Sequence, residues 1–216
     1  MLYSLCQERI KHRSFSYFSG MITDTIIGVD PGSTISGLCL LKNNQILSAS
    51  NTPNGDVFDK IKELLCGSPE ATIVIEDIFP YSVRLKPEVI ATCKFIGELS
   101  YRLNEIGAAI RYVARNSVKK WVFDTFPEIC ITRIDEKIAR LHAWKVKNGK
   151  RGYETKTGEL RAASFAFVDD RIVIAAIKVL LAIPTPKPGK SNSYGLKSHS
   201  WQALAAAAYY QRQNQA

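Results

Sequence analysis

Short apolar runs separated by polar turns dominate the first part of the chain. Residues 25–29 (TIIGV) are apolar and rich in β-branched side chains, a composition typical of a buried strand, and the turn residues DPGST follow at 30–34. Two further apolar runs cover 36–41 and 46–50, with a polar turn at 42–45 between them. The pattern predicts a three-stranded meander.

Helical and strand-like patterns alternate after the meander. The predicted elements are an amphipathic helix at 56–65, a buried strand at 71–75, a helix at 87–106 and a strand at 109–113, with 118–126 ambiguous. Alternation of this kind predicts an α/β fold with a mixed central sheet flanked by helices.

The composition changes in the last third of the chain. Residues 137 to 161 include eight Lys or Arg residues but only two glutamates, and three glycines are interspersed among them. This composition indicates a mobile basic loop or hairpin. A helix is predicted at 170–181 with Asp169 or Asp170 as its N-cap. A linker rich in Pro, Gly, Lys and Ser follows at 184–197, and an Ala-rich helix at 198–211.

The length of 216 residues suits one domain with a substantial core. We expect that domain at 22–216, with a basic insertion at about 137–161. Residues 1–21 are expected to be a disordered arm, or to precede a true start at Met21. Their basic, Ser-rich composition also resembles an organellar transit peptide, so the expected location is cytoplasmic with an organelle as the alternative.

Charge and cysteine content narrow the class of partner. The formal net charge of +9 favours an anionic partner, either nucleic acid or a membrane surface. No run of 18 apolar residues is present, so a membrane-spanning helix is not expected. The five cysteines are scattered and form no CxxC pair, so we interpret them as buried thiols in a reducing compartment rather than as a disulfide framework or zinc site.

Two acidic residues stand where buried strands are predicted to end. Asp30 follows the first strand and Glu76 follows the strand at 71–75. If these strands are neighbours, both carboxylates lie near the same sheet edge and offer the oxygen ligands that Mg²⁺ prefers. Two such ions can activate water and stabilise the leaving oxygen of a phosphodiester.

Each acid also has an ordinary structural interpretation. Asp-Pro-Gly is common turn chemistry, so Asp30 alone is more simply a turn former. Glu76 alone is a weak signal, because acids often end strands. Strand alternation directs Asp77 away from Glu76, so it is left out of the site.

Four segments of the chain carry a family resemblance: IIGVDPGSTISGLCLL at 26–41, VIEDIF at 74–79, ARNSVKKWV at 114–122 and LLAIPTPKPGKSNSYGLKSHSWQALAAAAYY at 180–210. In these segments the chain resembles the RuvC-type Holliday-junction resolvases. The resemblance is strong at the two acids, moderate at the end, and poor between 123 and 170.

The resemblance implies a ribonuclease H-like fold, a homodimer, two Mg²⁺ or Mn²⁺ ions per site, and symmetrical nicking of four-way DNA junctions. Asp30 matches the first catalytic acid of the family and Glu76 the second. The two remaining ligand positions fall on His199 and Gln202, which share a helix face at i and i+3. The implied metal ligands are Asp30, Glu76 and His199, and no membrane or small-molecule substrate is implied.

Gln202 departs from the family pattern, because an acid is expected there. Imidazole and amide ligands suit hard Mg²⁺ poorly, so we expect weaker binding of one ion, a preference for Mn²⁺, or reduced activity. Asp169 and Asp170 are an alternative source of negative charge, although helix capping is the simpler role for them.

Aromatic and basic residues supply the predicted DNA contacts. Phe79 matches a family aromatic placed at the junction, where stacking is worth about 1–3 kcal/mol per base; a core phenylalanine is the simpler interpretation of the residue alone. The predicted contacts to the DNA backbone are Arg84, Lys86, Lys119, Lys120, Lys147, Lys150 and Arg151, with Trp144 and Tyr153 interleaved in the insertion. A solvated surface also explains such charge.

Two rival functions remain. Sugar kinases and heat-shock ATPases share the Asp-x-Gly-Ser/Thr turn, but they need two ribonuclease H-like lobes, for which this chain is short. The more serious rival is a protein of the same fold that binds junction DNA with little or no cleavage, because Gln202 replaces an acid.

Overall fold

A computed structural model describes residues 25–78, 86–155, 159–184 and 196–215. Within it the chain forms two compact units, one made of residues up to 115 together with 184–216, and the other of residues 116–183. The first unit contains a β-sheet and the second is helical.

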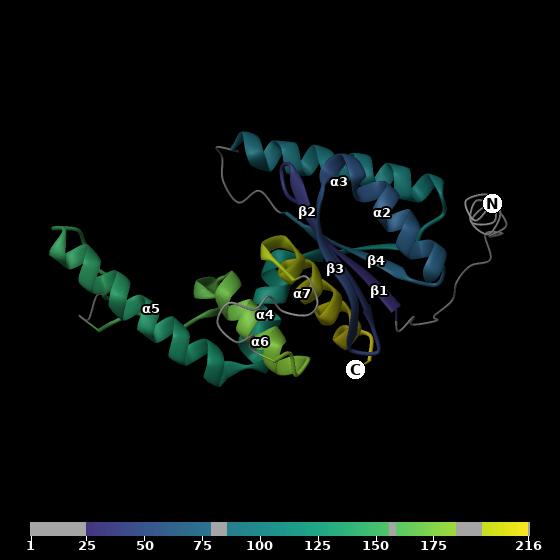
Figure 1. Ribbon diagram of the computed structural model, residues 1–216. Coiled ribbons are helices and arrows are strands. Elements are labelled where there is room, and N and C mark those ends of the chain that lie inside the picture. Colours follow the sequence, from purple (N-terminus) through teal and green to yellow (C-terminus); the bar gives the residue numbers. More distant parts are fainter. Residues whose placement is uncertain (1–24, 79–85, 156–158, 185–195, 216) are drawn as a thin grey trace. The chain divides into compact units, whose positions relative to one another are not determined.

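The first unit is built on a five-stranded mixed sheet with the order β3-β2-β1-β4-β5 (Figure 1). Its strands are β1 Thr25–Asp30, β2 Ile35–Lys42, β3 Gln45–Pro53, β4 Thr72–Asp77 and β5 Ile110–Ala114. The predicted meander is confirmed, because β1, β2 and β3 pair antiparallel in sequence order. The turn between β2 and β3 places Asn43 and Asn44 at φ 50° and 61°, a conformation that asparagine tolerates and that suits a tight hairpin.

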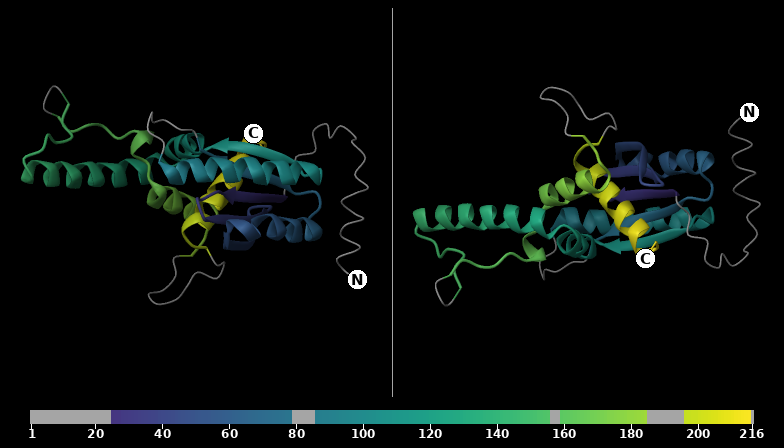
Figure 2. Two further views of the ribbon diagram at one scale, coloured as in Figure 1. Left: turned by 90° about the horizontal axis from the view of Figure 1, so that it is seen from above. Right: turned by 90° about the horizontal axis from the view of Figure 1, so that it is seen from below.

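Helices cover both faces of this sheet. Helices α2 (Asn54–Gly67) and α3 (Pro87–Glu105) lie on one face, and α7 (Ser198–Gln213) crosses the other (Figures 1 and 2). The α2/α3 face buries the apolar core formed by Ile27, Val29, Leu38, Leu40, Val57, Ile61, Ile73, Ile75, Leu99 and Leu103. The expected α/β class, with a mixed sheet between two helical layers, is confirmed.

Helix α7 approaches the strands closely because two glycines lie beneath it. A Cβ atom added at Gly28 of β1 would stand 2.1 Å from the carbonyl oxygen of Ala203. One added at Gly37 of β2 would stand 2.2 Å from the carbonyl carbon of His199. These positions require glycine because the helix backbone takes the space of a side chain.

The second unit corrects the expectation of a basic loop. Its helices are α4 (Arg115–Thr125), whose first residue, Arg115, belongs to the first unit, α5 (Pro127–Lys147) and α6 (Asp170–Leu180), with a short 3₁₀ helix, η1, at Phe165–Phe167. The expected loop or hairpin at 137–161 is therefore wrong for residues 137–147, which are helical, and the ambiguous 118–126 segment is mostly helix α4. Cys130, Ile134 and Ile138 recur every four residues and are buried, a periodicity that outweighs the lysine-rich composition.

Asp169 caps α6, as the sequence predicts. Its carboxylate accepts hydrogen bonds from the backbone N–H groups of Arg171 and Ile172 and lies 2.7 Å from Lys137 Nζ. Burial opposes ionisation of this carboxyl group, but the Lys137 hydrogen bond and charge and the two backbone donors outweigh it and lower its pKa. The capping role of Asp169 is confirmed.

The cysteine interpretation holds in part. Cys39 and Cys130 are buried free thiols, and burial raises the pKa of Cys39 to about 12. Cys93 is a free but exposed thiol and Cys66 is disulfide-bonded, so the interpretation as buried thiols is wrong at these two positions. Among the described helices, none combines the length and apolar character needed to cross a bilayer.

Candidate active site

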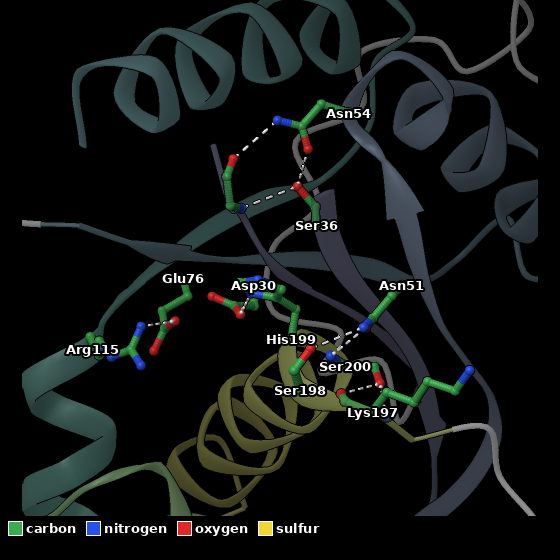
Figure 3. Close-up of polar contacts among 11 residues, drawn as sticks. Asp30, Ser36, Asn51, Asn54, Glu76, Arg115, Lys197, Ser198, His199 and Ser200 are labelled. Atoms are coloured by element: carbon green, nitrogen blue, oxygen red, sulfur yellow. Dashed lines mark hydrogen bonds and ion pairs between the residues drawn. The ribbon is translucent and has the colours of Figure 1, made fainter. Parts of the chain in front are cut away.

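Asp30 and Glu76 come from neighbouring parallel strands. The β1–β4 register pairs Val29 with Ile75, so the next residues, Asp30 and Glu76, stand level at the end of the pairing. Strands in a sheet lie about 4.8 Å apart, and level residues point to the same face. That face is the one covered by α7, opposite the α2/α3 core, and Figure 3 shows the two carboxylates side by side.

Both carboxylates lie just below the surface. Asp30 is 2 % exposed and Glu76 is 1 % exposed, so neither is fully hydrated. Each touches a side chain that reaches solvent: His199 at Asp30 is 42 % exposed, and Arg115 at Glu76 is 36 % exposed. Both acids are therefore buried, each beside a partly exposed side chain.

The turn after β1 does not use the Asp30 carboxylate. Ser36 Oγ accepts from the Gly32 N–H at 3.3 Å and donates to Asn54 Oδ1 at 2.7 Å, and Asn54 Nδ2 donates to the Gly32 carbonyl at 3.0 Å (Figure 3). The turn is thus held by Ser36 and Asn54. Asp30 directs its carboxylate across the sheet edge instead, contrary to the interpretation of this residue as a turn former.

His199 joins the site from the first turn of α7. Its Nδ1 lies 2.7 Å from Asp30 Oδ2, although the two residues are 169 positions apart in the sequence. The close contact orients both side chains.

Asn51 of β3 fixes where α7 begins. The N-cap residue of this helix is Lys197, whose side chain has no acceptor for the first N–H groups. Asn51 Oδ1 accepts from the Ser200 N–H at 3.0 Å, and Asn51 Nδ2 donates to Ser198 Oγ at 3.1 Å. These bonds bracket His199, so a strand residue sets the position of the imidazole.

We expect Asn51→Ala to reduce activity through α7 rather than through the acids. Loss of a helix-capping acceptor costs about 1–2 kcal/mol of unfolding free energy. In the DNA cleavage that the resemblance implies, the displaced His199 should lower the rate by about tenfold, the equivalent of 1.4 kcal/mol. Asn51→Asp keeps the acceptor and should restore most of both. Urea unfolding and single-turnover cleavage measure the two effects, and an Asn51→Asp variant as impaired as Asn51→Ala would contradict the capping role.

Arg115 is a site residue that sequence reasoning missed. It follows β5 directly, and β5 lies beside β4 with Val113 paired to Glu76. From this position Arg115 Nη1 stands 3.6 Å from Glu76 Oε2 (Figure 3). The signal that the sequence offers is a basic residue directly after a predicted strand. In this segment only Lys119 and Lys120 are predicted from the sequence, as DNA contacts.

Gln202 lies one helical turn after His199 and is 6 % exposed. Its Nε2 is buried without a hydrogen-bond partner among the described residues. A buried donor of this kind costs about 1–3 kcal/mol unless a ligand or water satisfies it. Gln202 therefore brings an unsatisfied donor to the inner face of α7, where the resemblance leads one to expect a negative charge.

The predicted DNA contacts fall in three groups. Phe79 and Arg84 lie outside the described residues. Lys86 is exposed at the start of α3. The rest belong to the second unit: Lys119 and Lys120 on α4, and the exposed Lys147, Lys150 and Arg151 at and beyond the end of α5. Their contact with DNA stays a prediction.

The end of α5 combines positive charge with exposed aromatic surface. Trp144 is exposed, Lys150 Nζ lies 5.1 Å from the centre of its ring, and Lys145 Nζ lies 4.0 Å from the centre of the Tyr153 ring. His142 holds the following turn, because its Nδ1 accepts from the Tyr153 N–H at 3.1 Å. The segment is therefore an ordered surface that combines cationic and aromatic side chains.

The donor set fits a divalent cation in chemistry but is not closed around one. No three His, Cys, Asp or Glu side chains of the described residues converge into a complete metal site. Asp30 Oδ2 and His199 Nδ1 are 2.7 Å apart, close to the roughly 3 Å between adjacent ligands of an octahedral ion with bonds of about 2.1 Å. Glu76, level with Asp30, supplies a second carboxylate, and Mg²⁺ ordinarily keeps water and phosphate oxygens as its other ligands.

Comparison with solved structures identifies the fold. The chain is similar to Thermus thermophilus RuvC in complex with a Holliday-junction substrate, with 15 % identity, a TM-score of 0.51, and coverage of 88 % of this chain and 95 % of that one. A second Thermus thermophilus RuvC structure gives 17 % identity, a TM-score of 0.49 and coverage of 88 % and 96 %. No protein-family model and no curated protein matches the chain. The RuvC-like, ribonuclease H-like fold implied by the sequence is confirmed.

The second unit also bears on the kinase alternative. Its described residues, 116–155 and 159–183, contain helices and one isolated β-bridge between Glu154 and Leu160, and no sheet. A kinase or heat-shock ATPase of this superfamily needs a second sheet-containing lobe to enclose its nucleotide. The described part of the chain provides none.

Proposed function

We propose that the protein is a structure-selective endonuclease that nicks four-way DNA junctions by metal-dependent hydrolysis of a phosphodiester. The observation that carries the proposal is the pair of nearly buried carboxylates, Asp30 and Glu76, level on adjacent strands with His199 at 2.7 Å from Asp30. The RuvC-like fold and the net charge of +9 support a DNA substrate.

In this proposal Asp30, Glu76 and His199 hold Mg²⁺ or Mn²⁺. The bound cation would supply Lewis-acid polarisation of a phosphate oxygen and make a bound water more acidic. The protein contributes rigid placement, because both acids belong to hydrogen-bonded strands and His199 is fixed through Asn51. Low hydration of the two carboxylates strengthens their attraction for a cation.

The remaining parts of the proposal concern the DNA and the assembly. Lys119, Lys120, Lys147, Lys150 and Arg151 would neutralise phosphates, and Phe79, Arg84 and Lys86 would contact the junction. A homodimer belongs to the proposal, because symmetrical nicks need two copies of one site related by a twofold axis.

A cleavage assay on a synthetic four-way junction tests the proposal. The wild-type protein should release paired nicked products with Mg²⁺ or Mn²⁺ and none with EDTA, while a linear duplex of the same sequence should remain uncut. Sedimentation of the same preparation tests the dimer. If the protein binds the four-way junction but nicks it neither with Mg²⁺ nor with Mn²⁺, the proposal is overturned.

The second candidate is a junction-binding protein with weak or no cleavage, and Gln202 is the observation that favours it. Its buried amide carries no charge where the resemblance implies an acid. The two candidates differ only in the cleavage result, since both predict tight binding of the junction.

We expect Gln202→Asp to raise cleavage and Mg²⁺ affinity by about 10-fold or more, because a nearby carboxylate adds a favourable charge interaction of a few kcal/mol for a divalent cation. Gln202→Glu serves as a size control and Gln213→Asp, at the far end of α7, as a charge control. Titration with Mg²⁺ during single-turnover cleavage measures both quantities. Unchanged values in Gln202→Asp would remove position 202 from the site.

A further inference from the structure

The contact between Arg115 and Glu76 changes the charge balance of the site. Arg115 is the first residue of α4 and stays protonated at every physiological pH. Its Nη1 lies 3.6 Å from Glu76 Oε2, and the Glu76 side chain is almost fully buried. A guanidinium at this distance supplies a permanent positive charge to the half of the site that holds Glu76.

We propose that Arg115 is a built-in cation that takes the place of one of the two divalent ions, so that the protein holds one divalent cation per chain. The inference rests on the proposed function only in assuming that the carboxylate site, at its Asp30–His199 half, binds a divalent cation. It concerns the number of ions, whereas the proposed function concerns the reaction.

The charge count supports one ion. Asp30 and Glu76 bring two negative charges, Arg115 brings one positive charge, and Gln202 brings none. One divalent cation and one phosphate of the substrate then balance these groups to neutrality. A second divalent cation would leave two uncompensated positive charges in a poorly hydrated site, which is unfavourable.

The geometry supports the same conclusion. The Glu76 carboxylate faces Arg115 on one side and Asp30 on the other, while Asp30 is bonded to His199 (Figure 3). This division explains why three ligands do not converge into one cluster among the described residues. The Asp30–His199 half retains the ligands for an ion, and the Glu76 half already has a cation beside it.

The buried amide of Gln202 agrees with this arrangement. Its Nε2 is a hydrogen-bond donor without a partner among the described residues, and it lies on the helix turn after His199. The amide adds no negative charge to the site, so it does not offset the charge of a second divalent cation.

Counting bound Mn²⁺ by electron paramagnetic resonance, on the full chain without DNA, tests the proposal. The wild-type protein should bind one Mn²⁺ per chain. Arg115→Gln should bind two, the second at least about tenfold more tightly than in the wild type, because a like charge within a few ångströms of the ion has been removed. Arg115→Lys, which keeps the charge, should bind one.

Arg111→Gln is the matched control, since Arg111 lies on the same strand and its Nη1 donates to the Ile110 carbonyl. It should bind one Mn²⁺ like the wild type. A wild-type count of zero or two would overturn the proposal, and so would an Arg115→Gln count equal to that of the wild type. A wild-type count of zero or two overturns the proposal even if Arg115→Gln fails to fold.

Thermal melting provides a readout independent of stoichiometry. Without metal, Arg115→Gln removes a positive charge beside the buried Glu76 and should melt below the wild type. Saturating Mn²⁺ should raise its melting temperature by at least about 4 °C more than that of the wild type. An equal Mn²⁺-induced rise in melting temperature in both proteins would contradict the proposal that Arg115 takes the place of a divalent ion. One bound Mn²⁺ per chain without nicking of junctions would overturn the proposed function and leave this inference standing. Two bound Mn²⁺ per chain with active nicking would overturn this inference and support the proposed function.

Discussion

Asp30→Asn should reduce the single-turnover rate of junction cleavage by about 10³-fold or more, because a metal ion contributes several kcal/mol to a phosphodiester transition state and each 1.4 kcal/mol is tenfold. Asparagine has the same shape as aspartate and can still pair with His199, so the fold and the α7 contact should persist. Glu76→Gln should have a similar effect on the rate. Binding of the intact junction, measured by gel shift in Ca²⁺, should change by no more than a few-fold.

Asp77→Asn is the matched control for these two substitutions. Asp77 follows Glu76 directly in β4, and strand alternation turns it toward the opposite face of the sheet. Its cleavage rate should stay within about twofold of the wild type. Cleavage by Asp30→Asn at a rate near that of the wild type would exclude the carboxylate pair as the catalytic centre.

Gly28→Ala should destabilise the protein strongly. The new Cβ would stand 2.1 Å from the Ala203 carbonyl oxygen and 3.1 Å from the Ala207 Cβ, so α7 must move away from β1. Overpacking against the α7 backbone should lower the free energy of unfolding by about 3 kcal/mol or more and the melting temperature by about 10 °C. Cleavage should fall as well, because the same helix carries His199.

Gly97→Ala provides the contrast. Gly97 lies within α3, and a Cβ there would have no neighbour within 4 Å among the described residues. Alanine in a helix interior is favoured over glycine by about 0.5–1 kcal/mol, so this variant should be as stable as the wild type or more stable. Calorimetry on both variants measures the difference, and a Gly28→Ala protein with the wild-type melting temperature would mean that α7 does not lie directly on β1.

The sequence was most informative where local pattern and burial agree. The β-branched run 25–29 and the run 71–75 became adjacent strands, and the acids that follow them stand level in the sheet. The Ala-rich segment at 198–211 became the helix over Gly28 and Gly37, and Asp169 became the cap of α6. In each case the signal is contained within a few consecutive residues.

The sequence was least informative where a contact joins distant segments. Nothing near Asn51 indicates that it caps a helix 147 residues later, and nothing near Arg115 indicates Glu76 as its partner. The lysine-rich composition of residues 137–147 predicts a loop, whereas the buried spacing of Cys130, Ile134 and Ile138 is that of the helix observed. Periodicity is the better guide there than composition.

The two faces of the sheet differ in how far apart along the chain their partners lie. Helices α2 and α3 adjoin in sequence the strands that they cover, so their face can form while little of the chain is ordered. The opposite face needs α7, whose His199 meets Asp30 across 169 residues and therefore only after a large loss of chain entropy. A partly folded molecule without docked α7 would thus carry its two acids without the imidazole, and the Asp30–His199 contact would form only when α7 packs on the sheet.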